Sequence, residues 1–201
     1  MTWEGTTRPA LPGLDVFPRT ASGALPTWVG VGGNPKSVIR AASYAFNLML
    51  AIIGGNPARF RTLSELYREA TKQLGLPDLP IGIHSPGHVA ETDEQAADEY
   101  WPHYQNFLLA VRRQRGFPTI TREYFDHEVE HGSLYVGSPE TVAAKVAKTM
   151  ELLGANRFDL KYGMGPMPQE HLMSTIRLFG TEVAPRVREL LGVEERAVVQ
   201  V

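Results

Sequence analysis

The sequence predicts an α/β fold in which parallel strands alternate with helices. The tetrapeptide Gly-Gly-Asn-Pro occurs twice, at Gly32–Pro35 and Gly54–Pro57, and each copy directly follows a short apolar run. In each copy asparagine is a good helix N-cap, and proline suits the first helical turn because its missing N–H would have no partner there. Each copy is therefore typical of a strand, a glycine turn and a helix. Repeats of this kind predict parallel βα units.

The spacing of apolar residues predicts where the strands and helices lie. Strands are expected where short runs are apolar or alternate with charged residues, over 28–31, 48–53, 81–84 and 157–162. Apolar positions three or four residues apart predict helices over about 35–46, 57–74, 93–111 and 139–153, and two more around 172–179 and 183–190. Residues 116–132 have no clear period, which favours an insertion or a lid-like loop.

Four such βα units amount to half of an eight-stranded TIM (β/α)8 barrel. The glycine pairs that begin at Gly32 and Gly54 are 22 residues apart, a repeat that is short for an open doubly wound sheet and comfortable for a barrel. The expected organisation is an N-terminal loop or arm over 1–26, a half-barrel domain over 27–192 and a C-terminal tail over 193–201. Half a barrel leaves two unpaired parallel edges, so a homo-oligomer or a partner chain is expected to cover them.

Composition limits the classes of function. The formal net charge of −2 gives no electrostatic reason to expect nucleic acid or an anionic membrane as a partner. The lack of cysteine excludes a disulfide framework and thiolate chemistry. No apolar run approaches the roughly 20 residues of a membrane span, and the amino terminus lacks the pattern of a signal peptide. A cytoplasmic protein is expected.

The first glycine turn is similar to two phosphate-binding motifs but matches neither. The stretch Gly30–Gly33 begins like a dinucleotide fingerprint, yet Pro35 stands in place of the third glycine and no acidic residue ends the next strand. Pro35 also stands where a P-loop needs glycine. The remaining functional interpretation is a single phosphate held by loop amides, the Asn34 side chain and the Ser37 hydroxyl at the positive end of the helix dipole. The alternative is a capped turn that binds nothing.

Other polar residues lie near the expected ends of strands. His84 and His88 follow the third strand, and His84 is a candidate donor to a cofactor or substrate. Pro86 and Gly87 lie between them and exclude the helix that a metal-binding i, i+4 pair needs, so no metal site is predicted. Lys161 either faces the mouth of the barrel or forms a structural ion pair.

Four passages, taken together and in order, carry a resemblance to a known family. They are Trp28–Ala42 (WVGVGGNPKSVIRAA), Leu48–Gly55 (LMLAIIGG), Val136–Val142 (VGSPETV) and Phe179–Pro185 (FGTEVAP). Each is weak alone, but in this order they are fairly specific. The chain from about Leu14 to Leu191 resembles the bacterial luciferase-like, flavin-dependent monooxygenase family.

Members of that family are eight-stranded barrels that bind reduced FMN at the carboxyl ends of the strands, where O₂ reacts with the flavin and a substrate is oxygenated. The resemblance implies that this chain supplies strands five to eight, the C-terminal half of the barrel. It implies no catalytic residue, and a deazaflavin would fit in place of FMN. The implied cofactor-binding positions are Gly33, Asn34 and Ser37 at the phosphate, Gly32 leaving room for it, and Ala51 and Ile52 along the ribityl chain and ring.

The resulting hypothesis is a luciferase-like flavin-dependent oxidoreductase or monooxygenase that uses reduced FMN and O₂ on a small organic substrate. One alternative is a non-catalytic flavin-binding or assembly module that completes its barrel with a second chain. Another is an aldolase-like or phosphosugar-binding half-barrel that uses the same phosphate site. Bound flavin distinguishes the first two from the third, and reductant-driven O₂ uptake distinguishes the enzyme from the module.

Overall fold

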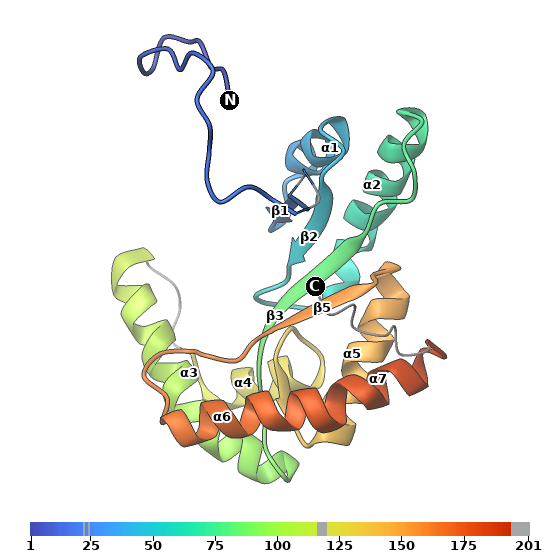
Figure 1. Ribbon diagram of the computed structural model, residues 1–201. Coiled ribbons are helices and arrows are strands. Elements are labelled where there is room, and N and C mark those ends of the chain that lie inside the picture. Colours follow the sequence, from blue (N-terminus) through green and yellow to red (C-terminus); the bar gives the residue numbers. More distant parts are fainter. Residues whose placement is uncertain (22, 24, 116–119, 194–201) are drawn as a thin grey trace.

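The computed structural model describes residues 1–201 apart from 22, 24, 116–119 and 194–201, and it shows a parallel sheet flanked by helices (Figure 1). The strands are β1 (Trp28–Val31), β2 (Asn47–Ala51), β3 (Ile81–Val89), β4 (Tyr135–Gly137) and β5 (Arg157–Lys161). The α-helices are α1 (Pro35–Ser43), α2 (Arg61–Gln73), α3 (Asp93–Arg115), α4 (Arg122–Glu130), α5 (Pro139–Leu153), α6 (Gln169–Leu178) and α7 (Ala184–Leu190). A 3-10 turn η1 (Pro57–Phe60) precedes α2, and a π-helical turn η2 (Phe179–Val183) joins α6 to α7.

All strand pairs of the described sheet are parallel. β1 pairs with β2, β2 with β3, and the first part of β3 with β5. The short strand β4 pairs with the last part of β3, at Gly87–Val89. Among the described residues, β1, β4 and β5 each have one strand neighbour and so form edges. This topology confirms the predicted α/β fold of parallel βα units.

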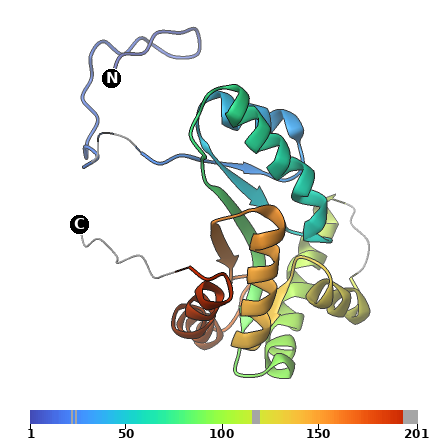
Figure 2. The ribbon, with the colours of Figure 1, turned by 90° about the vertical axis from the view of Figure 1, so that its right-hand side faces the viewer.

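One face of the sheet packs against helices. Leu48 and Leu50 of β2 and Ile83 of β3 are fully buried there, and α1, α2 and α5 cover this face (Figure 2). The helices contribute apolar side chains to the same core, among them Val38, Ala41, Leu63, Tyr67, Val142 and Val146. On the opposite face Met49 and Ala51 are only half-buried. The two faces of the sheet therefore differ, and the half-buried face is the one that a closed barrel would turn inward.

The predicted helix caps are confirmed. The Asn34 side chain accepts a hydrogen bond from the Lys36 amide at 3.0 Å, and the Asn56 side chain accepts one from the Ala58 amide at 2.8 Å. Each bond satisfies one of the amide groups that a helix start leaves without a partner. Gly154 ends α5 in the left-handed conformation, with φ of 60°, which glycine adopts without a steric penalty.

The structure differs from the prediction in three segments. The third strand runs to Val89 instead of ending at 84, because β4 and β5 both supply hydrogen-bond partners along its second half. The prediction of a loop over 116–132 is wrong for Arg122–Glu130, which form α4 with Thr121 as N-cap, while 116–119 lie outside the described residues. β4 was not predicted, since a three-residue strand has no detectable period.

The remaining segments lie at the two ends of the chain. Residues before β1 run away from the sheet in Figure 1, with a single bridge between Trp3 and Leu11. The predicted tail over 193–201 falls, apart from Val193, outside the described residues. Within the part of the chain that the structure describes, no helix is long and apolar enough to span a membrane.

Candidate functional site

The predicted phosphate-binding turn lies at the carboxyl end of β1 and is open. Gly32 and Gly33 are exposed, and a Cβ atom placed on either would have no neighbour within 4 Å. Gly33 has φ of 135°, a conformation that other residues rarely adopt. A ligand can therefore approach the backbone of this turn without meeting a side chain.

The amino terminus of α1 has the electrostatics of an anion site. Its first turn contains no acidic residue, and Lys36 lies in it. The hydroxyl of Ser37 has no hydrogen bond to any other described residue, and the side chain is half-exposed. The Asn34 side chain, in contrast, is already used as the helix cap. Loop amides and Ser37 are thus available to an anion, while Asn34 contributes by holding the turn in shape.

The second Gly-Gly-Asn-Pro copy is filled from within the protein. The Gly55 amide donates to both carboxylate oxygens of Glu128, at 3.1 and 2.9 Å, and the Ser133 amide donates to one of them at 3.1 Å. Glu128 is buried, and it lies on α4, 73 residues further along the chain. An internal carboxylate therefore holds the Gly55 amide of the second copy, whereas the glycines of the first copy have no such partner among the described residues.

Strand register assembles a row of side chains next to this turn. Ala51 of β2 pairs with His84 of β3, and His84 pairs with Asp159 of β5. Residues in register on parallel strands project from the same face, about 4.8 Å apart. His84 therefore lies between Ala51 and Asp159 on the half-buried face of the sheet. Sequence reasoning did not single out Asp159, although its place in an alternating strand was visible.

Ala51 and Ile52, the two cofactor-binding residues predicted at the end of the second strand, have their side chains on opposite faces of the sheet. Ala51 is half-buried on the face that carries His84, whereas Ile52 is fully buried and packs in the core beneath the helices. The backbone of Ile52 is also engaged, since its N–H donates to the His84 carbonyl at 2.9 Å and its carbonyl accepts from the Ser85 hydroxyl at 2.9 Å. Ala51 can therefore line a ligand on the open face, and the Ile52 side chain cannot in this conformation.

The end of β5 adds charge and an aromatic contact. The Lys161 ammonium lies over the Phe107 ring of α3, 5.3 Å from its centroid, and Arg157 pairs with Asp159 at 2.8 Å. Lys161 was predicted either to face the mouth of the barrel or to form a structural ion pair. Its charge instead packs against an aromatic face, so neither interpretation describes it fully. Asp159 is the residue of this strand that forms the ion pair.

His88 lies further along the same strand face as His84 but in a different environment. Its side chain is fully buried, with Nε2 2.7 Å from a carboxylate oxygen of Glu99 and Nδ1 2.8 Å from the Thr175 hydroxyl. Burial lowers the pKa of His88 below its usual range, and the Glu99 carboxylate opposes this effect in part. His171, on α6, lies 3.9 Å from the same Glu99 oxygen. Nothing in the local sequence indicates this group, because its members are 11 to 87 residues apart.

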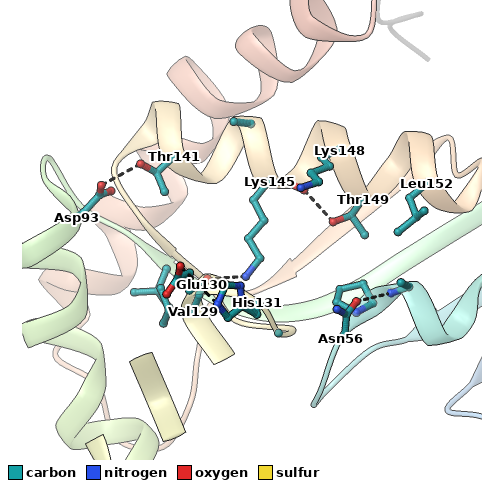
Figure 3. Close-up of a pocket in the computed structure, with 15 residues that line it drawn as sticks. Asn56, Asp93, Val129, Glu130, His131, Thr141, Lys145, Lys148, Thr149 and Leu152 are labelled. Atoms are coloured by element: carbon teal, nitrogen blue, oxygen red, sulfur yellow. Dashed lines mark hydrogen bonds and ion pairs between the residues drawn. The ribbon is translucent and has the colours of Figure 1, made fainter. Parts of the chain in front are cut away.

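A cavity of about 690 Å³ lies away from the Gly32–Ser37 turn, between α5, the end of α4 and η1, where Asn56 and Pro57 of the second Gly-Gly-Asn-Pro copy line it (Figure 3). Lys145 extends into it and donates to the carbonyls of Val129 and Leu134 at 2.6 and 2.8 Å, with a longer bond to Glu128 at 3.3 Å. Burial lowers the pKa of Lys145 to about 8, although the nearby Glu128 charge opposes the shift. Two of the three acceptors, the carbonyls of Glu128 and Val129, lie in the last turn of α4, and the third, of Leu134, directly precedes β4. Lys145 therefore stabilises the negative end of that helix, and none of the predicted cofactor-binding residues lines this cavity.

No histidine-centred metal site emerges from the described side chains, since none of their His, Cys, Asp and Glu groups forms a suitable set of three. His88 contacts one carboxylate and one hydroxyl instead. The open end of the described sheet thus offers an accessible glycine turn at the start of α1, a half-buried histidine with a neighbouring carboxylate, and a buried histidine network. Such an end can hold an elongated anionic ligand whose phosphate lies at α1 and whose body lies along the sheet.

Comparison with known proteins identifies relatives of this fold. The family model of luciferase-like monooxygenases matches residues 1–157. Monooxygenase RslO1 from Streptomyces bottropensis has a TM-score of 0.69 and 23% identity, over 92% of this chain and 55% of its own. The oxygenating constituent of 3,6-diketocamphane monooxygenase from the CAM plasmid of Pseudomonas putida, a type II Baeyer–Villiger monooxygenase in complex with FMN, has a TM-score of 0.73 and 18% identity, over 93% and 58%. The coenzyme F420-dependent tetrahydromethanopterin reductase from Methanopyrus kandleri has a TM-score of 0.56 and 17% identity, over 81% and 51%.

No curated protein sequence matches this chain. The chain spans little more than half the length of the solved structures it resembles. These structures confirm the α/β class and its correspondence with part of a barrel. Since the family model matches well over half of the residues, the resemblance seen in the sequence is confirmed as well: the chain belongs to the luciferase-like monooxygenase family.

Proposed function

We propose that this chain binds a flavin phosphate at the Gly32–Ser37 turn and takes part in the oxidation of a small organic molecule by O₂. The observation that carries the proposal is the difference between the two glycine turns, of which one is open and the other holds Glu128. Reduced FMN is the proposed cofactor, and a deazaflavin is the alternative. Both are supported by solved structures of similar fold, since one contains FMN and another depends on coenzyme F420.

Each residue of the turn has a defined part in this proposal. Gly32 and Gly33 leave the backbone accessible, and Ser37 offers a hydroxyl donor at the positive end of α1. Asn34 fixes the turn through its cap to Lys36. The open space beside these two glycines leaves room for a phosphate group. When bound, the flavin supplies the redox chemistry, while the chain binds and orients it and excludes water.

The half-buried face of the sheet is proposed to hold the rest of the cofactor and the substrate. Ala51 is small enough to let a flat ring approach β2, and His84 provides a hydrogen-bond donor at the next strand. Asp159, in register with His84, is suited to orient its ring. Ile52 is proposed only as support from beneath, because its side chain lies in the core.

Comparing FMN with riboflavin tests the phosphate site. Gly32 is exposed and has no neighbour within 4 Å, so Gly32→Glu places a negative charge at the turn without a steric clash. We expect this change to weaken FMN binding about tenfold or more, equivalent to about 1.4 kcal/mol, because the carboxylate repels the phosphate. Riboflavin, which has no phosphate, is expected to bind the variant as it binds the wild type. Fluorescence titration with both ligands measures the two affinities.

The uncharged variant Gly32→Gln is the matched control, because it has the same shape without the charge. We expect Gly32→Gln to weaken FMN binding by less than half of the free energy that Gly32→Glu costs. Ser37→Ala is expected to lower FMN affinity and leave riboflavin affinity unchanged, because one donor to the phosphate is removed. Equal losses for FMN and riboflavin in any of these variants would place the phosphate elsewhere. O₂ uptake with a chemically reduced flavin then distinguishes an enzyme from a non-catalytic flavin-binding module.

We also propose that a second copy of the chain completes the barrel by pairing β5 of one copy with β1 of the other. Both are edge strands of the described sheet, and Gly30, Met49, Gly82 and Arg157 form one register row from β1 to β5. In an eight-stranded barrel with a shear of 8, half a circuit displaces the register by about four residues. The β5 residue that faces Gly30 of the second copy then lies four positions away from Arg157. Within β5, that residue is Lys161.

Cysteine pairing tests this arrangement directly, because the chain has no native cysteine. Protein with Gly30→Cys is mixed with protein with Lys161→Cys under mild oxidation, and a disulfide-linked pair is expected in high yield. A mixture of Gly30→Cys and Lys148→Cys, whose lysine is exposed on α5, is the control. A monomer by light scattering, with equal yields in both mixtures, would rule out closure by a second copy and leave a different partner chain as the alternative.

A further inference from the structure

His88 has an unusual property among buried side chains: all of its hydrogen bonds can be satisfied whether it carries one ring proton or two. In the neutral form, Nε2–H donates to the Glu99 carboxylate over 2.7 Å, and Nδ1 accepts from the Thr175 hydroxyl over 2.8 Å. The hydroxyl oxygen meanwhile accepts from the Val89 amide at 3.2 Å. Every ring nitrogen therefore has a partner of the correct polarity.

The charged form is satisfied by one rotation of the Thr175 hydroxyl. Nδ1–H now donates to that oxygen, and the hydroxyl hydrogen turns to the Val89 carbonyl, which lies 3.1 Å away. Nε2–H keeps its bond to Glu99, which becomes an ion pair. A buried histidine that serves only as a structural link needs one such arrangement, whereas this one has two.

Glu99 connects this buried ring to a second histidine. Its Oε2 atom is 2.7 Å from His88 and 3.9 Å from Nδ1 of His171, whose side chain is 27% exposed. That Nδ1 atom is buried and has no hydrogen-bond partner among the described residues, so it is available to take up a proton. The other carboxylate oxygen accepts from Gln95 at 2.7 Å, which holds Glu99 in place.

We propose that His88, Glu99 and His171 hold one positive charge, which resides on His171 or on His88, with Glu99 as the counter-ion shared by both. Nε2 of His88 already carries the hydrogen that faces Glu99, so the second proton of His88 enters at Nδ1, on the side of Thr175. One ring releases a proton to water when the other takes one up, so the charge of the group is conserved. Both rings together are not expected to be charged, because one carboxylate oxygen serves them both. His88 then acts as a positioning residue, since its bonds hold α3 and α6 against β3.

The surroundings of His88 are consistent with a single positive charge. From α3 it is faced by Glu99, by the parallel Tyr100 ring at 5.8 Å and by the charge of His103, and from α6 by Thr175 and His171. The two other histidines disfavour a charge on His88, as does its burial, and Glu99 is the only one of these groups that favours it. The inference goes beyond the proposed function and needs no bound cofactor.

Histidine titration by NMR tests the proposal in the whole protein. The ring of His88 is expected to rest as the Nε2–H form and to gain its second proton while the protein remains folded. Glu99→Gln is expected to lower the midpoint of His88 by about one pH unit, because it removes the negative charge that favours the charged ring. His171→Gln, at a partly exposed position, is expected to raise the midpoint of His88, because it removes a competing positive charge.

Thr175→Val and Thr175→Ser form a matched pair that isolates the hydroxyl. Valine has the shape of threonine but cannot accept from Nδ1–H, so His88 is expected to stay neutral throughout the folded pH range. Serine retains the hydroxyl and is expected to titrate like the wild type. Circular dichroism at each pH confirms that the variants are folded.

Two results would overturn the proposal. One is a midpoint of His88 that does not change from wild type to Glu99→Gln or to His171→Gln, and the other is a His88 that becomes charged only as the protein unfolds. These readouts do not involve flavin. If the NMR results hold while FMN fails to bind, the proposed function is wrong and the proton site stands.

Discussion

Gly87→Ala is expected to destabilise the protein by about 3 kcal/mol or more, as overpacking against rigid backbone does. A Cβ atom at Gly87 would lie 2.2 Å from the Tyr135 carbonyl oxygen and 2.6 Å from a methyl of Leu160. The first of these atoms is backbone and belongs to the β3–β4 ladder, so relief requires the two strands to separate. Urea unfolding monitored by circular dichroism measures the loss.

Gly30→Ala is the matched control for this change. Gly30 also lies in a strand, β1, but a Cβ atom there would have no neighbour within 4 Å. We expect its free energy of unfolding to change by less than about 1 kcal/mol, since alanine loses less backbone entropy than glycine and meets no obstacle. Similar losses for both variants would show that β3 and β4 do not approach as closely as the structure indicates.

Glu128→Gln is the second change with a large expected effect, a loss of about 2–4 kcal/mol. The carboxylate accepts from the amides of Gly55 and Ser133, and an amide group in its place would turn N–H hydrogens toward N–H donors. It also supports the charge on Lys145. Removing it is therefore expected to bring the pKa of Lys145 below its present value of about 8.

Glu130→Gln tests whether the loss of stability in Glu128→Gln depends on the buried position of Glu128, and not simply on removing a carboxylate from α4. Its side chain is 74% exposed, and among the described residues it pairs with the neighbouring His131. We expect a change within about 0.5 kcal/mol, as for other exposed ion pairs. Equal stability of the two variants in urea would mean that Glu128 does not hold the second glycine turn. Amide exchange at Gly55, measured by NMR, is expected to increase only in Glu128→Gln.

Much of the local structure could be predicted from short-range patterns. Asn34 and Asn56 cap their helices as expected, because a cap depends on residues two or three positions away. Strand β2 and helix α2 were recognisable from apolar spacing alone. β3 was predicted too short because Pro86 and Gly87 usually interrupt strands, and here the neighbouring strands β4 and β5 compensate.

The candidate site was predictable only in part, for the same reason. The Gly32–Ser37 turn is a contiguous motif, so its residues were visible in the chain. Glu99, Thr175 and His171 have no such signal, since they meet His88 only after three elements have packed together. Ala51 and Ile52 were predicted to act together, yet alternation along the strand places their side chains on opposite faces.

The amino-acid sequence by itself determined the βα units, their caps, and the two identical Gly-Gly-Asn-Pro turns, because each of these depends on neighbours within one or two helical turns. Only the tertiary structure decided that the turns differ. It brings Glu128 to the amide of Gly55 and leaves the backbone of Gly32 and Gly33 accessible. A turn can attract an anion through its own amides, but whether that anion is a distant carboxylate of the same chain or a bound ligand depends on which elements pack beside it.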